Sequence, residues 1–326
     1  MNSLHFDRHL PPDLRTNALR ADAREGLTAS AKYIPSKWIF DAKGTELWEK
    51  ITQLPEYYAF RTERDILQAV ADEIAAITQA SDIIELGSGS AIKTTILLDS
   101  LRQAGTIRTY TSIDISESAL MAAGTRLMGE YPGLSVRAVL ADFETQAEAI
   151  AMHECPSPRL VLFLGGTIGQ LMPAQRAGFL RRLHGVFHPG DMLLLGVDLV
   201  KDPAELIAAY DDSAGVSTAF NKNLFTVLNT RVGADFNLDN FDYVVTWQDE
   251  AEYLAMWEQS RINQVVRLSD IDLLVEFAAG ERIWTGISAK FRRDGIQAEL
   301  ESAGFSLRRW WTDPDGRYAL SLSRLI

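Results

Sequence analysis

The residues best suited to chemistry follow predicted strands that end at one edge of a sheet. The first of these strands, 83–86, enters the turn 87–89, Gly-Ser-Gly, which is followed by helix-forming residues. Glycine adopts positive φ readily and lets the backbone approach a ligand. A helix N-terminus adds free N–H groups and partial positive charge, and Ser90 is a suitable cap. The turn therefore predicts a pocket for a nucleotide-type cofactor.

Three more predicted strands also end in residues that can bind a ligand. Asp114 ends the second strand, where in a βαβ unit an acid accepts both hydroxyls of a ribose. Asp142 and Phe143 follow the third and suit the amino group and ring face of adenine, and the fourth enters the glycine-rich segment 165–169. These patterns predict a Rossmann-like α/β fold. Its strands, with a fifth, are expected at 83–86, 109–113, 136–140, 160–164 and 192–197.

The spacing of the glycines decides between two cofactors. A dinucleotide fingerprint needs a third glycine at position 92, which is Ile92 here. An acidic residue at the strand end, Glu85, followed by Gly-x-Gly is instead typical of proteins that bind S-adenosylmethionine (SAM). We therefore predict SAM as the cofactor. A nicotinamide dehydrogenase is the alternative, because Asp114 would suit a ribose in that fold too.

Composition limits the possible partners. The 326 residues carry a formal net charge of −12, which disfavours a nucleic-acid track or an anionic membrane surface. The single cysteine, Cys155, permits no intrachain disulfide, and with His153 it forms no zinc-type ligand cluster, so we expect no metal. No apolar run has the length of a membrane span or the flanks of a signal sequence. We expect a cytoplasmic protein whose partner is a small molecule.

The alternation of strand and helix breaks after residue 197. The next region, 198–287, predicts a second lobe that is rich in antiparallel strands. Its expected elements are a helix at 202–210, a helix-like stretch at 250–257 and strands at 261–268, 272–277 and 282–287. A helix from 290 and a strand pair at 307–312 and 318–325, joined by Pro-Asp-Gly, end the chain.

Five parallel strands closed by an antiparallel hairpin suit the SAM methyltransferase sheet. We therefore predict an α/β, Rossmann-like class I SAM methyltransferase core formed by 61–197 plus 288–326. A second, α+β substrate-binding lobe is expected from 1–60 plus 198–287, placed over the strand ends.

Several further motifs make the chain similar to a known family. They are Ile-Thr-Gln-Leu-Pro-Glu-Tyr-Tyr at 51–58, Arg-Thr-Glu at 61–63, Glu-Leu-Gly-Ser-Gly at 85–89 with Lys93, Phe-Leu-Gly-Gly-Thr-Ile-Gly at 163–169, Ala-Tyr-Asp-Asp at 209–212, Phe-Asn-Lys-Asn at 220–223 and Ile-Ser-Ala-Lys-Phe at 287–291. Over nearly its whole length the sequence resembles the histidine Nα-methyltransferase family of the ergothioneine pathway. The resemblance implies a two-lobed monomer that methylates the α-amino group of an amino acid with SAM.

The resemblance also implies roles for individual residues. The implied cofactor-binding residues are Phe40, Gly87, Ser88, Lys93, Asp114, Asp142 and Phe143. The implied substrate-binding residues are Tyr57, Gly165, Gln170, Tyr210, Gln264, Gly286 and Ser288. Lys93 would meet the methionyl carboxylate of SAM, Tyr210 would donate to the substrate carboxylate, and the Gly165 carbonyl would steer the amine. Tyr57 is the catalytic candidate, because it or solvent would take the proton of the amine.

Five positions depart from the family pattern. Phe40 replaces a tyrosine that reaches the cofactor, and Gln170 replaces an asparagine that grips the substrate carboxylate. In an Arg-Ile-Glu-Met segment, the glutamate and methionine are replaced by Asn263 and Gln264. Gly286 replaces the glutamate that pairs with the imidazole of histidine.

The loss of a carboxylate at Gly286 affects which amino acid we expect the protein to methylate. A charge-assisted hydrogen bond contributes roughly 1.5–3 kcal/mol, so histidine would lose that much binding. We therefore predict methylation of the α-amino group of an aromatic amino acid, such as tryptophan or a derivative, with Trp284 or Arg282 partly filling the space. Histidine methylation through a rearranged pocket is the alternative, and a catalytically inactive SAM-binding partner protein is another.

Overall fold

The computed structural model describes residues 4–10, 12–144, 146 and 158–326 and divides the chain into two compact units. Unit 1 comprises residues 1–10, 59–200 and 289–326, and unit 2 comprises 11–58 and 201–288. Cys155 and His153, where no zinc site is expected, lie outside the described residues.

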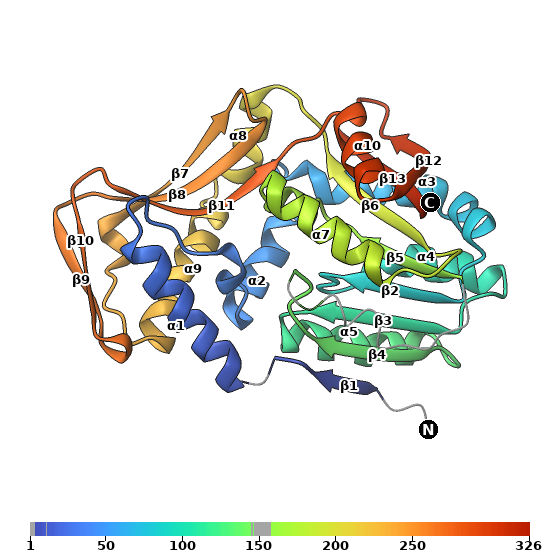
Figure 1. Cartoon of the computed structure of the whole chain (residues 1–326), viewed down its shortest axis with the longest axis horizontal. Coiled ribbons are helices and arrows are strands. Elements are labelled where there is room, and N and C mark those ends of the chain that lie inside the picture. Colours follow the sequence, from blue (N-terminus) through green and yellow to red (C-terminus); the bar gives the residue numbers. More distant parts are fainter. Residues whose placement is uncertain (1–3, 11, 145, 147–157) are drawn as a thin grey trace. The chain divides into compact units, whose positions relative to one another are not determined.

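Unit 1 is built on an eight-stranded sheet with the strand order β1-β4-β3-β2-β5-β6-β13-β12 (Figure 1). The strands are β1 (His5–Arg8), β2 (Asp82–Leu86), β3 (Thr109–Asp114), β4 (Ser135–Leu140), β5 (Arg159–Phe163), β6 (Met192–Asp198), β12 (Phe305–Thr312) and β13 (Tyr318–Leu325). The first six in this order run parallel, whereas β13 is antiparallel to β6 and to β12. Every residue of β2 and β5 is buried, as expected for parallel strands covered on both faces.

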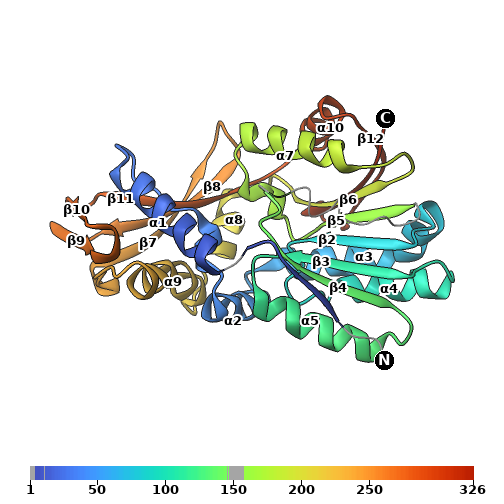
Figure 2. The same cartoon turned by 60° about the horizontal axis from the view of Figure 1, so that its bottom comes forward.

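Helices cover both faces of this sheet. Figures 1 and 2 show α4 and α5 on one face and α7 and α10 on the other. The helical elements of this part of the chain are α3 (Tyr58–Thr78), α4 (Thr94–Gln103), α5 (Glu117–Glu130), the 3₁₀ turn η2 (Thr167–Gln170), α7 (Pro173–Val186) and α10 (Arg293–Ser302). This layering and strand order confirm the predicted Rossmann-like class I methyltransferase fold.

The N-terminal strand corrects the predicted domain division. We assigned all of 1–60 to the second lobe, yet β1 pairs in parallel with β4 and belongs to unit 1. Leu4, Phe6 and Leu10 pack against a buried cluster that includes Leu120 and Leu140. Four residues with a single apolar side chain, Phe6, carry too weak a pattern to be recognised as a strand. The other unit boundaries lie at 59, 200 and 289, where we expected 61, 197 and 288.

The predicted helix cap at Ser90 is wrong. Helix α4 begins after Lys93, which occupies the N-cap position without a capping side-chain bond, and Ser90 lies in the preceding turn. The chain therefore reaches helical geometry at a different residue from the nearest good capping residue.

Unit 2 combines helices with two small antiparallel sheets. Its helical elements are α1 (Pro12–Thr28), η1 (Ser36–Ile39), α2 (Ala42–Ile51), α8 (Pro203–Tyr210), α9 (Val216–Arg231), η3 (Leu238–Asn240) and η4 (Ser269–Ile271). Its strands are β7 (Phe241–Gln248), β8 (Tyr253–Ser260), β9 (Gln264–Leu268), β10 (Leu273–Phe277) and β11 (Arg282–Ala289), in the orders β11-β8-β7 and β10-β9. Phe225, Phe236 and Phe241 form part of the core, with the first two stacked at a centroid distance of 4.4 Å.

Strand β8 overturns the predicted helix-like stretch at 250–257. Leu254, Ala255 and Met256 are good helix formers, which is why the local sequence favoured a helix. The segment instead pairs with β7 over eight residues, from Phe241↔Ser260 to Gln248↔Tyr253. Pairing between distant segments therefore overrides local propensity here. Helix α9 and strand β7 were not predicted either.

None of the helices in the described part of the chain is long and apolar enough to span a bilayer.

Candidate active site

The glycine turn after β2 has the backbone conformation that the sequence predicted. Gly87 and Gly89 have φ values of 66° and 50°, in the left-handed region that favours glycine. A Cβ atom on Gly87 would lie 3.5 Å from the ring of Phe143, whereas nothing lies within 4 Å of that position on Gly89. Ser88, between them, is buried. The turn thus leaves open space beside Gly89 and a phenyl ring beside Gly87.

Asp114 lies against this turn at the end of β3. One of its carboxylate oxygens accepts the N–H of Gly89 at 2.9 Å and the other accepts the N–H of Ser116 at 2.8 Å. The side chain is therefore fixed at the carboxyl end of the sheet, where the fold predicts the acid that binds a ribose.

Asp142 and Phe143 follow β4 at the same edge of the sheet. The Asp142 carboxylate accepts the N–H of Glu144 at 3.0 Å. The Phe143 ring packs edge-to-face against Phe163 and Phe179, with centroid distances of 5.4 and 6.1 Å. These contacts hold an aromatic face beside the glycine turn. With Gly87 and Asp114, the donors and acceptors present fit the ribose and adenine of SAM.

Glu85, the acid of the Glu-x-Gly-x-Gly pattern, has a structural role beneath the glycine turn. Its side chain is buried at the end of β2 and accepts hydrogen bonds from the hydroxyls of Thr94 and Tyr110, both at 2.6 Å. Burial raises the pKa of the Glu85 carboxyl to about 7, although the two hydroxyl bonds act in the opposite direction. The residue joins β2, β3 and the start of α4 beneath the turn.

Glu63 on α3 is a buried acid to which the sequence assigned no role. Its carboxylate is fully buried, accepts the N–H of Gly165 at 2.8 Å and the hydroxyl of Tyr318 at 2.9 Å, and forms an ion pair with Lys93. A Cβ atom on Gly196 would lie 2.0 Å from a Glu63 oxygen, so β6 must carry glycine there. A signal existed, because Glu63 lies in the apolar stripe of α3, and a charge on such a stripe is normally partnered.

Glu63 brings Lys93 and Gly165 together. The Lys93 ammonium lies 3.9 Å from where a Gly165 Cβ would be, and it also lies 4.8 Å from the centre of the Phe60 ring. Gly165 has a φ of 75° and is exposed, as is Gln170 at the end of η2. Lys93 is thus held at the edge of the sheet by a buried acid, beside a glycine whose carbonyl was expected to steer the substrate amine.

The predicted substrate residues of unit 2 form a second group. The hydroxyls of Tyr210, at the end of α8, and Ser288, on β11, are 2.7 Å apart. The Tyr57 ring lies edge-on to Tyr210 at 5.9 Å and to Trp48 at 5.5 Å. This group combines two hydrogen-bonded hydroxyls with aromatic walls, a combination suited to a small molecule with a polar end.

Phe40 belongs to the same aromatic group. Its ring packs against Phe220 at 5.3 Å and Trp48 at 6.1 Å. The neighbouring backbone is fixed by Asn223, whose amide donates to the carbonyl of Ile39 at 3.0 Å and to the carboxylate of Asp41 at 2.8 Å. These two hydrogen bonds give a structural reason for the last asparagine, Asn223, of the Phe-Asn-Lys-Asn motif.

Gly286 is buried in β11 and shares a face with Ser288, because side chains two residues apart in a strand point the same way. A Cβ atom on Gly286 would lie 3.3 Å from Ser36 Cβ and 3.5 Å from Met256 Cε. The side chain from the neighbouring strand that faces Gly286 is therefore a methionine of β8, from the segment that was expected to be helical.

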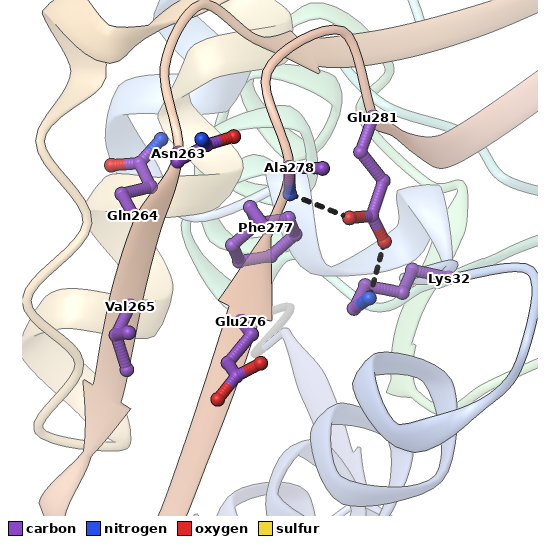
Figure 3. A pocket seen from close by; sticks show the side chains of 8 residues that line it. All are labelled: Lys32, Asn263, Gln264, Val265, Glu276, Phe277, Ala278 and Glu281. Carbon is purple, nitrogen blue, oxygen red and sulfur yellow. Dashed lines mark hydrogen bonds and ion pairs between the residues drawn. The ribbon is translucent and has the colours of Figure 1, made fainter.

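The structure does not bring Gln264 to this group. Gln264 begins β9 and forms hydrogen bonds with Asn240 at 3.1 Å and Ser260 at 2.6 Å. With Asn263 it lines an open pocket at the β9–β10 hairpin, shown in Figure 3. Gln264 therefore lies apart from the Tyr57, Tyr210 and Ser288 group, and its role in binding substrate stays a prediction.

The charged groups that line the pocket in Figure 3 include a lysine and a glutamate that are already paired with each other. The pocket is lined by Lys32, Asn263, Gln264, Val265, Glu276, Phe277, Ala278 and Glu281. Its lysine forms an ion pair with Glu281, which also accepts the N–H of Ala278 at 2.9 Å. Within the described ranges, no group of three or more His, Cys, Asp or Glu residues could hold a metal ion.

Comparison with known proteins decides the family. The model of the histidine-specific, SAM-dependent methyltransferase family matches residues 19–325. The chain belongs to this family. It is 46% identical over 321 residues to a histidine N-alpha-methyltransferase of Mycolicibacterium smegmatis, covering 98% of this chain and 99% of that protein. It is 45% identical over 315 residues to that of Mycobacterium tuberculosis, covering 97% of each.

A more distant relative has a different substrate in its name. The chain is 26% identical over 321 residues to a 4-dimethylallyltryptophan N-methyltransferase of Aspergillus fumigatus, covering 92% of both proteins. The family membership confirms the predicted enzyme class, a SAM-dependent N-methyltransferase, and SAM as the methyl donor. It also removes the nicotinamide dehydrogenase alternative.

We expect Asp114→Ala to weaken SAM binding at least about ten-fold, because an acid that accepts ribose hydroxyls contributes more than 1.4 kcal/mol. Titration calorimetry with SAM measures the change. Asp99→Ala, which removes an exposed carboxylate on α4, is the control and should bind SAM normally. Unchanged affinity in Asp114→Ala would contradict the ribose assignment.

We expect Glu85→Gln to change how stability depends on pH. The pKa of this carboxyl is raised from 4.5 in the unfolded chain to about 7 in the folded protein. Between these values the unfolded state binds fewer protons, so Glu85 lowers stability as pH rises. From pH 5 to pH 7 the variant should gain about 2–3 kcal/mol of unfolding free energy relative to the wild type. Parallel urea-unfolding profiles across this range would refute the assignment.

Proposed function

We propose that this protein transfers a methyl group from SAM to the α-amino group of free histidine. The observation that carries the proposal is the Tyr210–Ser288 hydroxyl pair, walled by Tyr57, in a chain 46% identical to a histidine N-alpha-methyltransferase over almost its full length. This group provides hydrogen-bond donors for a carboxylate and aromatic surfaces for the rest of an amino acid.

The residues of unit 1 serve the methyl donor. Asp114 would hold the ribose, Asp142 and Phe143 the adenine, and Lys93 the methionyl carboxylate. SAM supplies a methyl group that its positively charged sulfur already activates. The chain therefore needs to bind, orient and keep water from the reactants, and it needs no acid to activate the donor.

The amine must be neutral before it can accept a methyl group. Its nitrogen lone pair forms the new N–C bond, and the ammonium proton has to leave first. The carbonyl of Gly165 would accept an amine N–H, and the Tyr57 hydroxyl would take the proton or pass it to water. Tyr210 and Ser288 would meanwhile hold the substrate carboxylate.

A second candidate substrate is an aromatic amino acid such as tryptophan. It is favoured by Gly286, which provides neither charge nor bulk where the family carries a glutamate. The distant 4-dimethylallyltryptophan relative is consistent with an indole in this family. Histidine is preferred because the two relatives with 45% and 46% identity are histidine enzymes by name.

Incubation of the purified protein with SAM and each common amino acid, followed by mass spectrometry, tests the proposal. We expect histidine to gain methyl groups with the highest kcat/KM of the panel. A higher kcat/KM for tryptophan would replace histidine by the second candidate. The absence of any methylated amino acid would contradict both.

We expect Tyr210→Phe to raise KM for the amino acid about ten-fold while lowering kcat less, because the lost hydroxyl binds the carboxylate before and during the reaction alike. Steady-state kinetics separates the two constants. Tyr33→Phe removes another hydroxyl of unit 2, one that donates to Glu25, and should leave both constants unchanged. A loss confined to kcat would show that the Tyr210 hydroxyl acts in the transition state.

A further inference from the structure

Glu258 on β8 is a buried acid with no partner in the described part of the chain. Its side chain is 0% exposed, and neither carboxyl oxygen accepts or donates a hydrogen bond there. Burial raises the pKa of this carboxyl to about 8, an effect that Lys222 opposes and Asp242 reinforces. An unpaired buried carboxyl destabilises a fold, so Glu258 requires a partner that the described residues do not supply.

The register of β7 and β8 places this acid among the substrate residues. Glu258 pairs with Tyr243, whose hydroxyl donates to the carbonyl of Tyr210 at 3.1 Å. Met256 lies two residues away on the same face of β8, and its Cε is 3.5 Å from the position of a Gly286 Cβ. The acid therefore shares a sheet face with the residue that the family uses to recognise imidazole.

The charged neighbours of Glu258 are engaged elsewhere. The ammonium of Lys222, on α9, donates to the carbonyl of Leu238 at 3.0 Å. Asp242 precedes Tyr243 on β7, so its side chain points to the opposite face, where it pairs with Arg261. Neither group satisfies the carboxyl, which leaves it available to a bound molecule.

We propose that Glu258 is the residue that recognises the imidazole of the substrate, in place of the carboxylate that Gly286 lacks. The inference rests on the proposed histidine methylation. Neighbouring strands are about 4.8 Å apart, and diagonal neighbours lie about 7–8 Å apart. A glutamate on β8 can therefore reach a ligand beside Gly286 on β11, where Ser36 and Met256 line the position that a side chain at 286 would occupy.

The chemistry of the two groups is complementary. A carboxyl with a raised pKa carries a proton near pH 7, so it can either donate to the bare nitrogen of a neutral imidazole or accept from its N–H. Transfer of that proton to the imidazole produces a carboxylate–imidazolium pair without any other change. Indole has an N–H donor and no nitrogen acceptor, so it can only donate to this carboxyl and cannot take its proton.

Kinetics with histidine tests the proposal through Glu258→Leu and the nearly isosteric Glu258→Gln. We expect Glu258→Leu to raise KM for histidine about ten-fold or more, with a smaller effect on kcat, because a charge-assisted pair is lost before the reaction begins. Glu258→Gln should fall between this variant and the wild type. Glu276→Gln, on the exposed face of β10, is the matched control and should behave as the wild type.

Thermal unfolding separates recognition from support of the fold. An unpartnered buried acid should lower stability, so Glu258→Leu should have a higher Tm than the wild type although it uses histidine less well. The double variant Glu258→Leu/Gly286→Glu returns an acid to β11, where Ser36 must shift by a few tenths of an ångström. We expect it to recover much of the lost histidine KM.

The outcomes distinguish this inference from the proposed function. If the wild type methylates histidine and Glu258→Leu has an unchanged KM, the role of Glu258 is refuted and the proposed function stands. A lower Tm in both single variants without a change in histidine KM also refutes it. If the wild type methylates no histidine, the proposed function fails and this inference fails with it.

Discussion

The buried carboxylate of Glu63 is the interaction on which the edge of the large sheet depends. It accepts the backbone N–H that starts the Gly165–Gly166 turn, binds the hydroxyl of Tyr318 and neutralises Lys93. A buried acid is tolerated when it is paired and hydrogen-bonded in this way, and removal of one partner is then costly. Helix α3 is thereby tied to the strand ends from which Lys93 and Gly165 are presented.

The sequence was sufficient for the parts of the structure that have local signals. The glycine turn, Asp114 and the Asp142–Phe143 pair follow directly from apolar runs and the residues that end them, and the terminal hairpin follows from Pro-Asp-Gly. Glu63 could not be assigned a role in this way, because its partners lie 30, 102 and 255 positions away in the sequence. Long-range pairing has no local pattern.

Most of the wrong secondary-structure predictions lie in unit 2, because its strands also depend on pairing between distant segments. Strand β8 is composed largely of helix formers and exists because it pairs with β7 and β11. A helix-like interpretation of 250–257 gives no reason to place Met256 beside Gly286. Glu258 follows that segment, and no local pattern groups it with the predicted substrate residues.

Gly196 shows how tightly these positions constrain one another. Any side chain on it would occupy the place of a Glu63 oxygen and crowd the Tyr318 hydroxyl at 2.8 Å. An evolutionary lineage could not replace this glycine in one mutational step without displacing the acid that anchors Lys93. Gly196 and Glu63 should therefore vary together among descendants or not at all. The presence of both residues is then a better marker of this buried acid and its contacts than either residue alone.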